Sequence, residues 1–549
     1  MTLRTTRTTT RTRGAGLLGA TALAVGLLAP ATAAPATAAP LTQVGPVAVQ
    51  GAAPGAARAA RAADGVTVRN ACVRSVPEPG STAKVRICFT LFKPAKASRS
   101  HKVPVIMHSH GWGGSRTTDP AEFADLTSRG YGVLSFDQRG WGESGGHAHV
   151  ENPAYEGVDV RTLVRFIARQ PWVRKDGPGD PRLGAIGGSY GGGYQFVGAF
   201  ELLKRRGKPV FDALAPEITW NDLSESLAPE GVVRTEWALA LSAASVPDDA
   251  LPRNVYKALI EGAATGTWPD GSIPGTEDMV SFMRKNGPQW HTRAGRRLDI
   301  PVLFGQGTTD SLFPLQQGLD NWRTAITNRA RKKSIFIGYN GGHVLPSVLP
   351  QGVSVTSDPC SRALGSRDFR ALSVRFFDEQ LRGHDRGVRG YHKVHLATAD
   401  STCVTQTSGG TRAGTAVPIG TVASTTAAGA PLPYLVADGP VTVAGTPYLT
   451  GAVTALGVQN RAFYGLAVGS SPLDAHLVQN NVLPLAEDTP VSGAQRRVEL
   501  PSAAVRVPRG QHLYLMVTPI SDTFAGMSSR TPGVITIDDT VVHLPVVRR

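Results

Sequence analysis

Residues 183–193 read LGAIGGSYGGG, an apolar run that leads into a serine with a glycine two positions to either side. Side chains at Gly187 and Gly191 would collide with the neighbouring strand and helix, because the backbone must turn sharply there. The residues that follow carry apolar side chains and a basic last turn before Gly207, which is typical of a helix and its stop. A glycine-bracketed serine between a strand and a helix is the turn that exposes a nucleophilic hydroxyl. We therefore predict that Ser189 is a catalytic nucleophile.

A second segment, from Gly142 to Gly146, matches the same pattern around Ser144. The residues before it read as a turn rather than as the end of a strand, and Pro153 follows too soon for a helix to begin cleanly. We therefore interpret Ser144 as a loop residue. The alternative for Ser189, an ordinary glycine-rich turn, fits poorly with a serine that has glycines on both sides.

The N-terminal residues 1–38 have the pattern of a secretory signal peptide. Four arginines precede a short apolar run from Gly14 to Leu28, and small residues typical of cleavage sites follow. Residues 39–64 are rich in Ala, Pro, Gly and Arg, and we expect them to form a disordered leader. No later stretch is apolar enough to cross a bilayer. The sequence thus predicts a secreted, extracellular protein without a membrane span.

The chain of 549 residues is long enough for two or three domains, and its formal net charge of +15 includes four arginines of the signal segment. This mild basic excess would attract anionic cell-wall polymers loosely. Lysines and arginines are not clustered with aromatic residues, so nucleic-acid binding is not expected. The sequence has neither the Cys/His spacing of a metal site nor a phosphate-cradling glycine loop, so we expect no metal and no cofactor.

The four cysteines all lie beyond the signal segment, and an even number in an oxidising compartment favours two disulfides. Two expected strands flank a turn at Gly80, and Cys72 and Cys88 are equidistant from that turn. They would face each other across the hairpin, which leaves Cys360 and Cys403 to pair. Buried free thiols are the alternative interpretation.

Apolar strands alternate with amphipathic helices from residue 65 onward, which predicts a doubly wound α/β sheet. The alternation gives way to helical, Trp-bearing segments where a cap over the carboxyl ends of the strands would lie. Short β runs with turn residues dominate the C-terminal part and predict a β-sandwich. The expected division is an α/β domain first part at 65–215, a helical cap at 216–297, an α/β domain second part at 298–398, a linker at 399–429 and a β-sandwich at 430–549.

Two late strands end in loops that carry candidate partners for Ser189, namely Asp310 and His343. A serine hydroxyl needs an adjacent base that is itself oriented by an acid. The chain order Ser, Asp, His with the last two just past late strands is the order of the α/β-hydrolase fold. Asp320 lies further along, in an expected helix, and is the weaker candidate for the acid.

Acyl transfer through a serine also needs N–H donors for the oxyanion. The backbone N–H of Tyr190, next after the nucleophile, is the first candidate, and the backbone N–H of Trp112 in the glycine-rich loop 110–114 is the second. The alternative for this loop is a tight turn with packed histidines. We expect Asp137 and Arg139 to brace loops near the site rather than to take part in chemistry.

Several of these segments together resemble the Xaa-Pro dipeptidyl-peptidase/cocaine esterase family of serine hydrolases. They are Asp137-Gln-Arg-Gly-Trp-Gly-Glu-Ser144, Glu156-Gly-Val-Asp159, Gln170-Pro-Trp172 and Gly187-Gly-Ser-Tyr-Gly191, together with the β-rich C-terminal part. The resemblance implies an α/β-hydrolase domain, a helical cap, a C-terminal jelly roll and a triad of Ser189, Asp310 and His343. Members commonly supply a tyrosine hydroxyl to the oxyanion from the loop that here carries Trp112 and no tyrosine.

The sequence therefore predicts a secreted serine hydrolase that cleaves an ester or amide bond of a small molecule or peptide through an acyl-enzyme. One alternative is an exported acyltransferase that uses the same triad, and another is a cell-wall-binding protein that acts through its β domain. The resemblance includes both Xaa-Pro exopeptidases and esterases. We expect hydrolysis of short aryl esters, with Xaa-Pro peptidase activity as the alternative.

Overall fold

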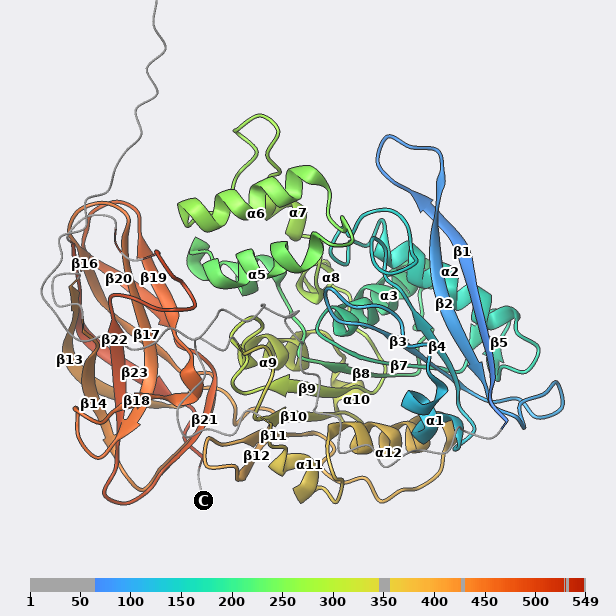
Figure 1. Cartoon of the computed structure of the whole chain (residues 1–549). Coiled ribbons are helices and arrows are strands. Elements are labelled where there is room, and N and C mark those ends of the chain that lie inside the picture. Colours follow the sequence, from blue (N-terminus) through green and yellow to red (C-terminus); the bar gives the residue numbers. More distant parts are fainter. Residues whose placement is uncertain (1–64, 345–355, 426–429, 528, 530–532, 548–549) are drawn as a thin grey trace, which may run out of the picture. The chain divides into compact units, whose positions relative to one another are not determined.

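The computed structural model describes residues 65–344, 356–425, 430–527, 529 and 533–547 (Figure 1). The predicted signal peptide at 1–38 and the leader at 39–64 lie outside these residues. Within them, no helix combines the length and the apolar character needed to cross a membrane.

A ten-stranded sheet forms the centre of the α/β part, and its spatial order β1-β2-β4-β3-β7-β8-β9-β10-β11-β12 is that of a doubly wound sheet. The strands from β4 to β11 in this order run parallel, whereas β1, β2 and β12 are antiparallel to their neighbours. The predicted α/β class is therefore confirmed, with antiparallel strands added at both edges. The strands are β1 (Thr67–Pro77), β2 (Lys84–Lys93), β3 (Val105–Ser109), β4 (Gly132–Phe136), β7 (Leu183–Gly188), β8 (Ala213–Glu217), β9 (Leu303–Gly307), β10 (Ile335–Tyr339), β11 (Lys393–Ala397) and β12 (Cys403–Thr407), and a small separate pair is formed by β5 (Lys175–Gly177) and β6 (Asp180–Pro181).

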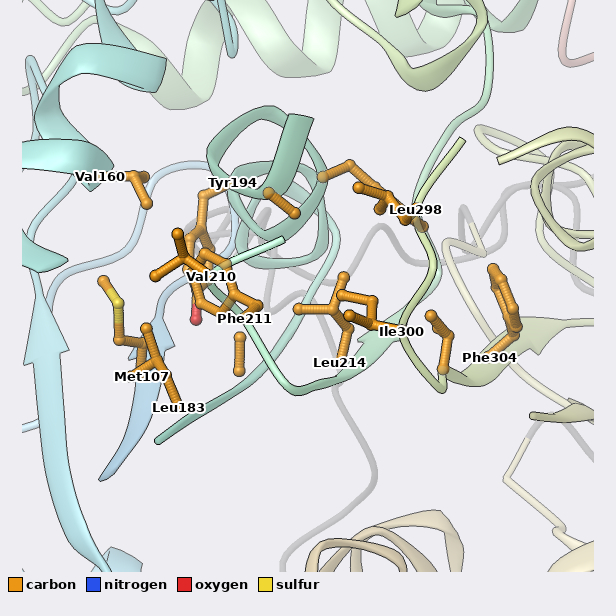
Figure 2. Packing of buried hydrophobic residues seen from close by; sticks show 14 of the residues in the cluster. Met107, Val160, Leu183, Tyr194, Val210, Phe211, Leu214, Leu298, Ile300 and Phe304 are labelled. Atoms are coloured by element: carbon orange, nitrogen blue, oxygen red, sulfur yellow. The ribbon is translucent and has the colours of Figure 1, made fainter. Parts of the chain in front are cut away.

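Helices cover both faces of this sheet, because successive residues of its central strands point to opposite sides. Val105 and Met107 of β3 belong to the core under one helical layer, while Ile106 between them belongs to the core on the other face. Figure 2 shows part of the first core, where Met107 and Leu183 lie near Tyr194 of the helix above them. The first layer contains α2 (Glu156–Arg169), α3 (Tyr190–Arg206), α9 (Leu315–Thr324) and α10 (Asn328–Arg331), and the second contains η1 (Pro120–Phe123), α1 (Ala124–Thr127), α11 (Pro359–Ala363) and α12 (Phe369–Arg382).

A group of short helices lies between β8 and β9, in the part of the chain expected to form a cap. These helices share an apolar core with loops of the α/β part, and it includes Trp220, Trp237, Leu259 and Tyr190. Since they follow the carboxyl end of β8, they extend from the edge of the sheet where parallel strands usually hold an active site. They are α4 (Leu223–Leu227), η2 (Pro229–Gly231), α5 (Thr235–Ser245), α6 (Arg253–Thr265), α7 (Met279–Met283) and α8 (Pro288–Arg293).

The C-terminal part is β-rich and has a core of its own, formed mainly by Val, Leu and Ile side chains. Two antiparallel sheets face this core, one of order β13-β23-β16-β20 and one of order β14-β22-β17-β18, with β19 pairing to β17 and a further pair β15-β21. The strands are β13 (Thr415–Thr425), β14 (Leu432–Asp438), β15 (Val441–Gly445), β16 (Tyr448–Ala455), β17 (Asn460–Gly469), β18 (His476–Leu477), β19 (Leu483–Glu487), β20 (Val491–Glu499), β21 (Ala503–Val507), β22 (His512–Thr518) and β23 (Val534–Leu544), and the one-turn helix η4 (Val478–Asn480) follows β18.

The expectation of a linker at 399–429 is wrong for most of that stretch. Strand β12 completes the α/β sheet by pairing with β11, and β13 pairs with β23 along nearly its whole length. The residues of β13 are mostly Thr, Ala, Gly and Val, and their alternation is too weakly apolar to mark a strand in the sequence. The antiparallel partner, which lies more than a hundred residues later, supplies the backbone hydrogen bonds that make it one.

Both predicted disulfides are present. Cys72 and Cys88 stand directly opposite each other in the β1–β2 register and are bonded, and Cys360 of α11 is bonded to Cys403 at the start of β12. The first disulfide joins the two strands at one edge of the sheet, and the second joins α11 to the last strand at the opposite edge.

Candidate active site

Ser189 lies in the sharp turn between β7 and α3, with backbone angles φ 57° and ψ −123°. Its N–H donates to the carbonyl of Glu217 at the end of β8, at 3.0 Å. A Cβ added at Gly187 would lie 2.5 Å from the Gly191 carbonyl oxygen, and one added at Gly191 would lie 2.4 Å from the carbonyl oxygen of Ser109. Backbone contact therefore excludes side chains at both glycines, as the sequence pattern implies.

The structure brings Ser189, His343 and Asp310 together in one hydrogen-bonded chain. His343 Nε2 lies 2.8 Å from Ser189 Oγ, and His343 Nδ1 lies 2.7 Å from Asp310 Oδ2. All three residues are buried. Asp310 follows β9 and His343 follows β10, so the two loops leave the same edge of the sheet as the serine turn after β7. With Nδ1 donating to the carboxylate, Nε2 is free to accept the serine proton.

Neighbouring groups hold the carboxylate and the imidazole in place. Asp310 Oδ1 accepts from the backbone N–H groups of Leu312 at 3.0 Å and Phe313 at 2.7 Å. The Phe313 and Trp237 rings stand edge-on to the His343 ring, with centroids 5.1 and 5.9 Å away. Asp320 lies on α9 and pairs with Arg323 at 3.1 Å, away from this arrangement.

The loop 110–114 lies against the start of α3, where the Trp112 ring meets the Tyr190 ring edge-on with centroids 5.1 Å apart. His110 Nε2 accepts from the backbone N–H of Gln138 at 3.1 Å, so its Nδ1 carries the proton and donates to the Gly111 carbonyl at 2.8 Å. Burial lowers the pKa of His110, which keeps this neutral form. The Gly111 carbonyl is thereby turned toward His110, and the N–H of Trp112, on the opposite side of the same peptide plane, points away from it.

The backbone N–H groups of Trp112 and Tyr190 have no acceptor among the described residues. This is ordinary for Tyr190, because the first N–H groups of a helix lack intrahelical partners. Both residues line the pocket beside Ser189. The two N–H groups are therefore available to an oxygen bound there.

The second serine pattern has a structural role. Ser144 Oγ accepts from the Cys88 N–H and donates to the Asp137 carbonyl, each at 2.8 Å. The Asp137 side chain forms a buried ion pair with Arg116 and accepts from the Glu143 N–H. Arg139 is fully buried and forms two hydrogen bonds of 2.8 Å to Asp159 and one of 2.7 Å to Glu78. These residues brace the loops behind the site, as the sequence suggested.

A pocket opens beside Ser189, and its lining is mostly apolar. Trp112, Tyr190, Trp220 and Phe313 form the wall near the serine. Most of the remaining lining side chains come from the cap, and all of them are apolar. Sequence reasoning missed this lining, because apolar residues at helical spacing in the cap look the same whether they face a core or a pocket.

Sequence reasoning also missed a group of buried polar side chains behind this pocket. Glu151 is 1% exposed, and neither of its carboxylate oxygens has a hydrogen-bond partner within the described structure. Burial, together with the nearby Glu156 and Asp159 charges, raises its pKa well above the usual range. The ring nitrogens of His291 are likewise unpartnered there, and burial lowers the pKa of His291 to about 4. In the part of the chain that is described, no cluster of His, Cys, Asp or Glu could hold a metal ion.

Residues 83–344 match the family model described as X-Pro dipeptidyl-peptidase (S15 family). These residues include β2, the serine turn, the cap and the loops that carry Asp310 and His343. A curated relative from Escherichia coli, an uncharacterized 31.7 kDa protein in the traX-finO intergenic region, is 32% identical over 99 residues. That match covers 18% of this chain and 33% of the relative. The chain thus spans about a third of the length of the curated relatives it matches.

Three solved structures share the fold over most of the chain. A CocE/NonD family hydrolase from Staphylococcus aureus has a TM-score of 0.59 at 13% identity, and the match covers 89% of this chain and 98% of that one. An aminopeptidase from a marine sediment Thaumarchaeota archaeon has a TM-score of 0.60 at 12% identity, with 88% and 97% covered. An α-amino acid ester hydrolase has a TM-score of 0.56 at 12% identity, with 92% and 100% covered. At these identities the likeness shows the fold alone, including the β-rich C-terminal part.

Proposed function

We propose that this chain is a serine hydrolase that acts on esters or peptides through an acyl-enzyme formed on Ser189, because its residues 83–344 match the model of the X-Pro dipeptidyl-peptidase (S15) family. The observation that carries the proposal is the hydrogen-bonded chain from Ser189 Oγ through His343 to Asp310, with heavy-atom distances of 2.8 and 2.7 Å. These are the distances that general-base activation of a serine requires.

In the first half of the reaction, Ser189 Oγ attacks the carbonyl carbon while His343 Nε2 takes the hydroxyl proton. Asp310 stays ionised and orients the imidazolium that forms. The tetrahedral intermediate then collapses, the bond to the leaving group breaks, and His343 returns the proton to the departing alcohol or amine. In the second half, water takes the place of the serine hydroxyl, and the acid is released with Ser189 regenerated.

The oxyanion of both intermediates would lie between the N–H groups of Tyr190 and Trp112. Tyr190 follows the nucleophile at the N-terminus of α3, where the helix end favours negative charge. Trp112 is held by the hydrogen bonds that His110 makes on either side of the loop. Each donor of this kind typically contributes about a hundredfold or more to kcat. This pair requires no side-chain hydroxyl from the loop.

The site of action would be outside the cell. The N-terminal residues have the pattern of a signal peptide, and two disulfides join the α/β part. Among candidate bonds, we place esters first, because an alcohol leaves more readily than an amine and no carboxylate lines the pocket for a peptide amino terminus among the described residues.

The test compares two serine variants with the wild-type enzyme. Ser189→Ala should lower the hydrolysis of p-nitrophenyl butyrate by at least about 10⁴-fold and abolish labelling by a fluorophosphonate probe. Ser144→Ala is the matched control, because it removes the other patterned serine without touching the pocket. It should keep most of the activity and all of the labelling. A fluorophosphonate adduct mapped to Ser144, or full activity in Ser189→Ala, would overturn the assignment.

A further inference from the structure

We infer that the pocket beside Ser189 selects an uncharged, apolar acyl group, aryl or medium-length alkyl, and rejects an acyl group that carries a free α-ammonium. The inference rests on the proposed function, because it treats this pocket as the acyl site of the acyl-enzyme. It concerns the acyl part of the substrate. Esters of carboxylic acids that lack an α-amino group should be hydrolysed faster than aminoacyl esters and than peptides with a free amino terminus.

The cap supplies most of the pocket wall, and apart from the Trp220 indole it supplies hydrocarbon and thioether surface. Leu223 and Leu227 come from α4, Val255 and Leu259 from α6, and Met279, Phe282 and Met283 from α7. Among the described residues that line the pocket, the polar side-chain atoms are the hydroxyls of Ser189 and Tyr190 and the indole N–H groups of Trp112 and Trp220. Methionines make such a wall adaptable to acyl groups of different shape.

None of the carboxylates in the cap or at the end of β8, which precedes it, lines the pocket. Glu217 accepts from the Tyr339 hydroxyl at 3.2 Å, beneath the loop that carries His343. Asp222 caps α4 by accepting from the N–H groups of Ser224 and Glu225. The pocket lining likewise includes none of the other acids of the cap, which are Glu225, Glu230, Glu236, Asp248, Asp249, Glu261, Asp270, Glu277 and Asp278.

Glu151 is the carboxyl group that comes nearest to such a role, and Trp220 separates it from the acyl pocket. Glu151 lines a smaller cavity of about 220 Å³ together with Asn286 and His291, and Trp220 contributes to the walls of both cavities. The Trp220 indole N–H donates to the Asn286 carbonyl, which anchors the ring between them. Burial favours the neutral carboxyl of Glu151, so this group would offer little attraction to a cation even if the ring moved.

The physical consequence is a large preference for the uncharged acyl group. An ammonium group moved from water into a hydrocarbon pocket loses its hydration and gains no partner. An apolar acyl chain gains instead from each buried methylene, which corresponds to a rate increase of roughly threefold to fourfold per group until the pocket is filled.

The decisive measurement uses a matched pair of substrates, methyl phenylacetate and methyl 2-amino-2-phenylacetate, at a pH at which the amine is protonated. The two esters share the leaving group and the ring, and they differ in the α-ammonium. We expect kcat/KM to be at least about 100-fold higher for methyl phenylacetate after correction for the rates with hydroxide. A p-nitrophenyl ester series from acetate to octanoate should show rising kcat/KM. A higher value for the amino ester, or for an Xaa-Pro anilide, overturns the inference.

A pair of neighbouring variants on α6 tests the wall itself. Leu259→Glu places a carboxylate on the pocket side of the helix and should lower the preference for methyl phenylacetate by at least about tenfold. Ile260→Glu changes the next residue, which is 55% exposed and does not line the pocket, and should leave the preference unchanged. If Leu259→Glu does not fold, Leu259→Gln serves in its place, and the wild-type substrate pair still decides the question. An unchanged preference in a folded Leu259→Glu protein counts against the inference.

Fluorophosphonate labelling separates this inference from the proposed function. A wild-type enzyme that is not labelled at Ser189 and hydrolyses none of these compounds would refute the acyl-enzyme proposal. An enzyme that is labelled at Ser189 but prefers the amino ester would refute only the inference about the pocket.

Discussion

At the scale of single residues, the candidate site depends on a strained serine held by its surroundings. Ser189 has a positive φ, which costs on the order of 1–3 kcal/mol for a residue with a side chain. The hydrogen bond from its N–H to the Glu217 carbonyl and the close contacts of Gly187 and Gly191 offset that cost. The turn directs Oγ toward His343 and leaves the first N–H of α3 open to an oxyanion.

The hydrogen bonds of Asp310 predict the effect of replacing it by asparagine. Its Oδ1 accepts two backbone N–H groups, so the amide oxygen of Asp310→Asn would take that place and the NH₂ group would face His343 Nδ1. Nδ1 would then have to accept, which puts the imidazole proton on Nε2 and prevents it from activating Ser189. We expect kcat to fall by about 10⁴-fold with the fold retained, as measured by ester hydrolysis and circular dichroism.

The control for this variant is Asp320→Asn. Asp320 pairs with Arg323 on α9 and does not contact His343, so its replacement should leave kcat within about threefold of wild type. The identification of Asp310 as the acid would be wrong if the Asp320 variant lost activity and the Asp310 variant kept it.

At the scale of elements, the loop that carries His343 is connected to the serine strand through a buried carboxyl group. Glu217 ends β8, its carbonyl binds the Ser189 N–H, and its side chain accepts from Tyr339 at the end of β10. Burial raises the pKa of Glu217 to about 7. The pair therefore links the ends of β7, β8 and β10 at the edge of the sheet that holds the site.

This raised pKa makes stability depend on pH with a definite sign. The unfolded chain releases the Glu217 proton near pH 4.5, whereas the folded protein keeps it up to about pH 7. The stability that protonated Glu217 contributes is therefore present below about pH 4.5 and is lost as the pH rises through about 7, by on the order of 3 kcal/mol. Between pH 5 and 8 the wild-type protein should therefore lose about 3 kcal/mol more unfolding free energy than the Glu217→Gln variant. Urea denaturation at each pH measures this difference.

Other buried carboxyl groups titrate in the wild type and in Glu217→Gln alike, so the difference between the two pH profiles reports on Glu217. Glu122→Gln, a change at an exposed position of η1, is the control and should leave the pH dependence of wild type unchanged. Identical pH profiles for the wild type and Glu217→Gln would show that Glu217 is ionised in the folded protein.

The two disulfides predict different losses of stability on removal. The residues of the Cys72–Cys88 pair are 16 apart and those of Cys360–Cys403 are 43 apart, so chain entropy gives contributions of about 3 and about 4 kcal/mol. We expect the double variant Cys72→Ala/Cys88→Ala to lose less unfolding free energy than the double variant Cys360→Ala/Cys403→Ala. Denaturant titration without reductant measures both losses. Peptide mapping that joins Cys72 to Cys360 or Cys403 would contradict the basis of this prediction.

At the scale of the whole molecule, the β-rich C-terminal part contributes directly to the surroundings of the site. Asn481 Nδ2 donates to the Asp310 carbonyl at 3.2 Å, and Thr235 of the cap donates to the Ala525 carbonyl at 2.9 Å. The buried Arg234 guanidinium lies 4.8 Å from the centre of the Phe524 ring. The cap and the loop that carries Asp310 are therefore both held from the C-terminal part.

The contact of Asn481 predicts that a change in the β-rich part affects catalysis. Asn481→Leu removes a donor from a buried carbonyl, which should cost about 1–3 kcal/mol of unfolding free energy and lower kcat several-fold as the Asp310 loop loosens. Ester hydrolysis by the purified variant measures the effect. Gln495→Leu, at an exposed position of β20, is the matched control and should change neither quantity. Unaltered kcat in Asn481→Leu would show that the loop needs no support from this side.

Much of the α/β fold and the residues of the candidate site could be predicted from the sequence, because they depend on local patterns. Steric exclusion at Gly187 and Gly191 acts within a few residues, and it singles out Ser189 over Ser144. Asp310 and His343 follow strands of a parallel sheet, whose carboxyl ends share one edge whatever the rest of the chain does. The structure brings these side chains together, and their catalytic roles stay a prediction until the variants are measured.

Tertiary structure decided the features that depend on partners distant in the chain. Strand β13 exists because β23 pairs with it, and its own composition resembles a linker. Asn481 reaches Asp310 across 171 residues, and no local pattern marks such a contact. The apolar side chains of α4, α6 and α7 belong to a buried core and also line a pocket, because the cap helices leave a space beside Ser189. Helical periodicity in the sequence predicts which face of a helix is buried. Only the packing of the helices decides whether protein or substrate covers that face.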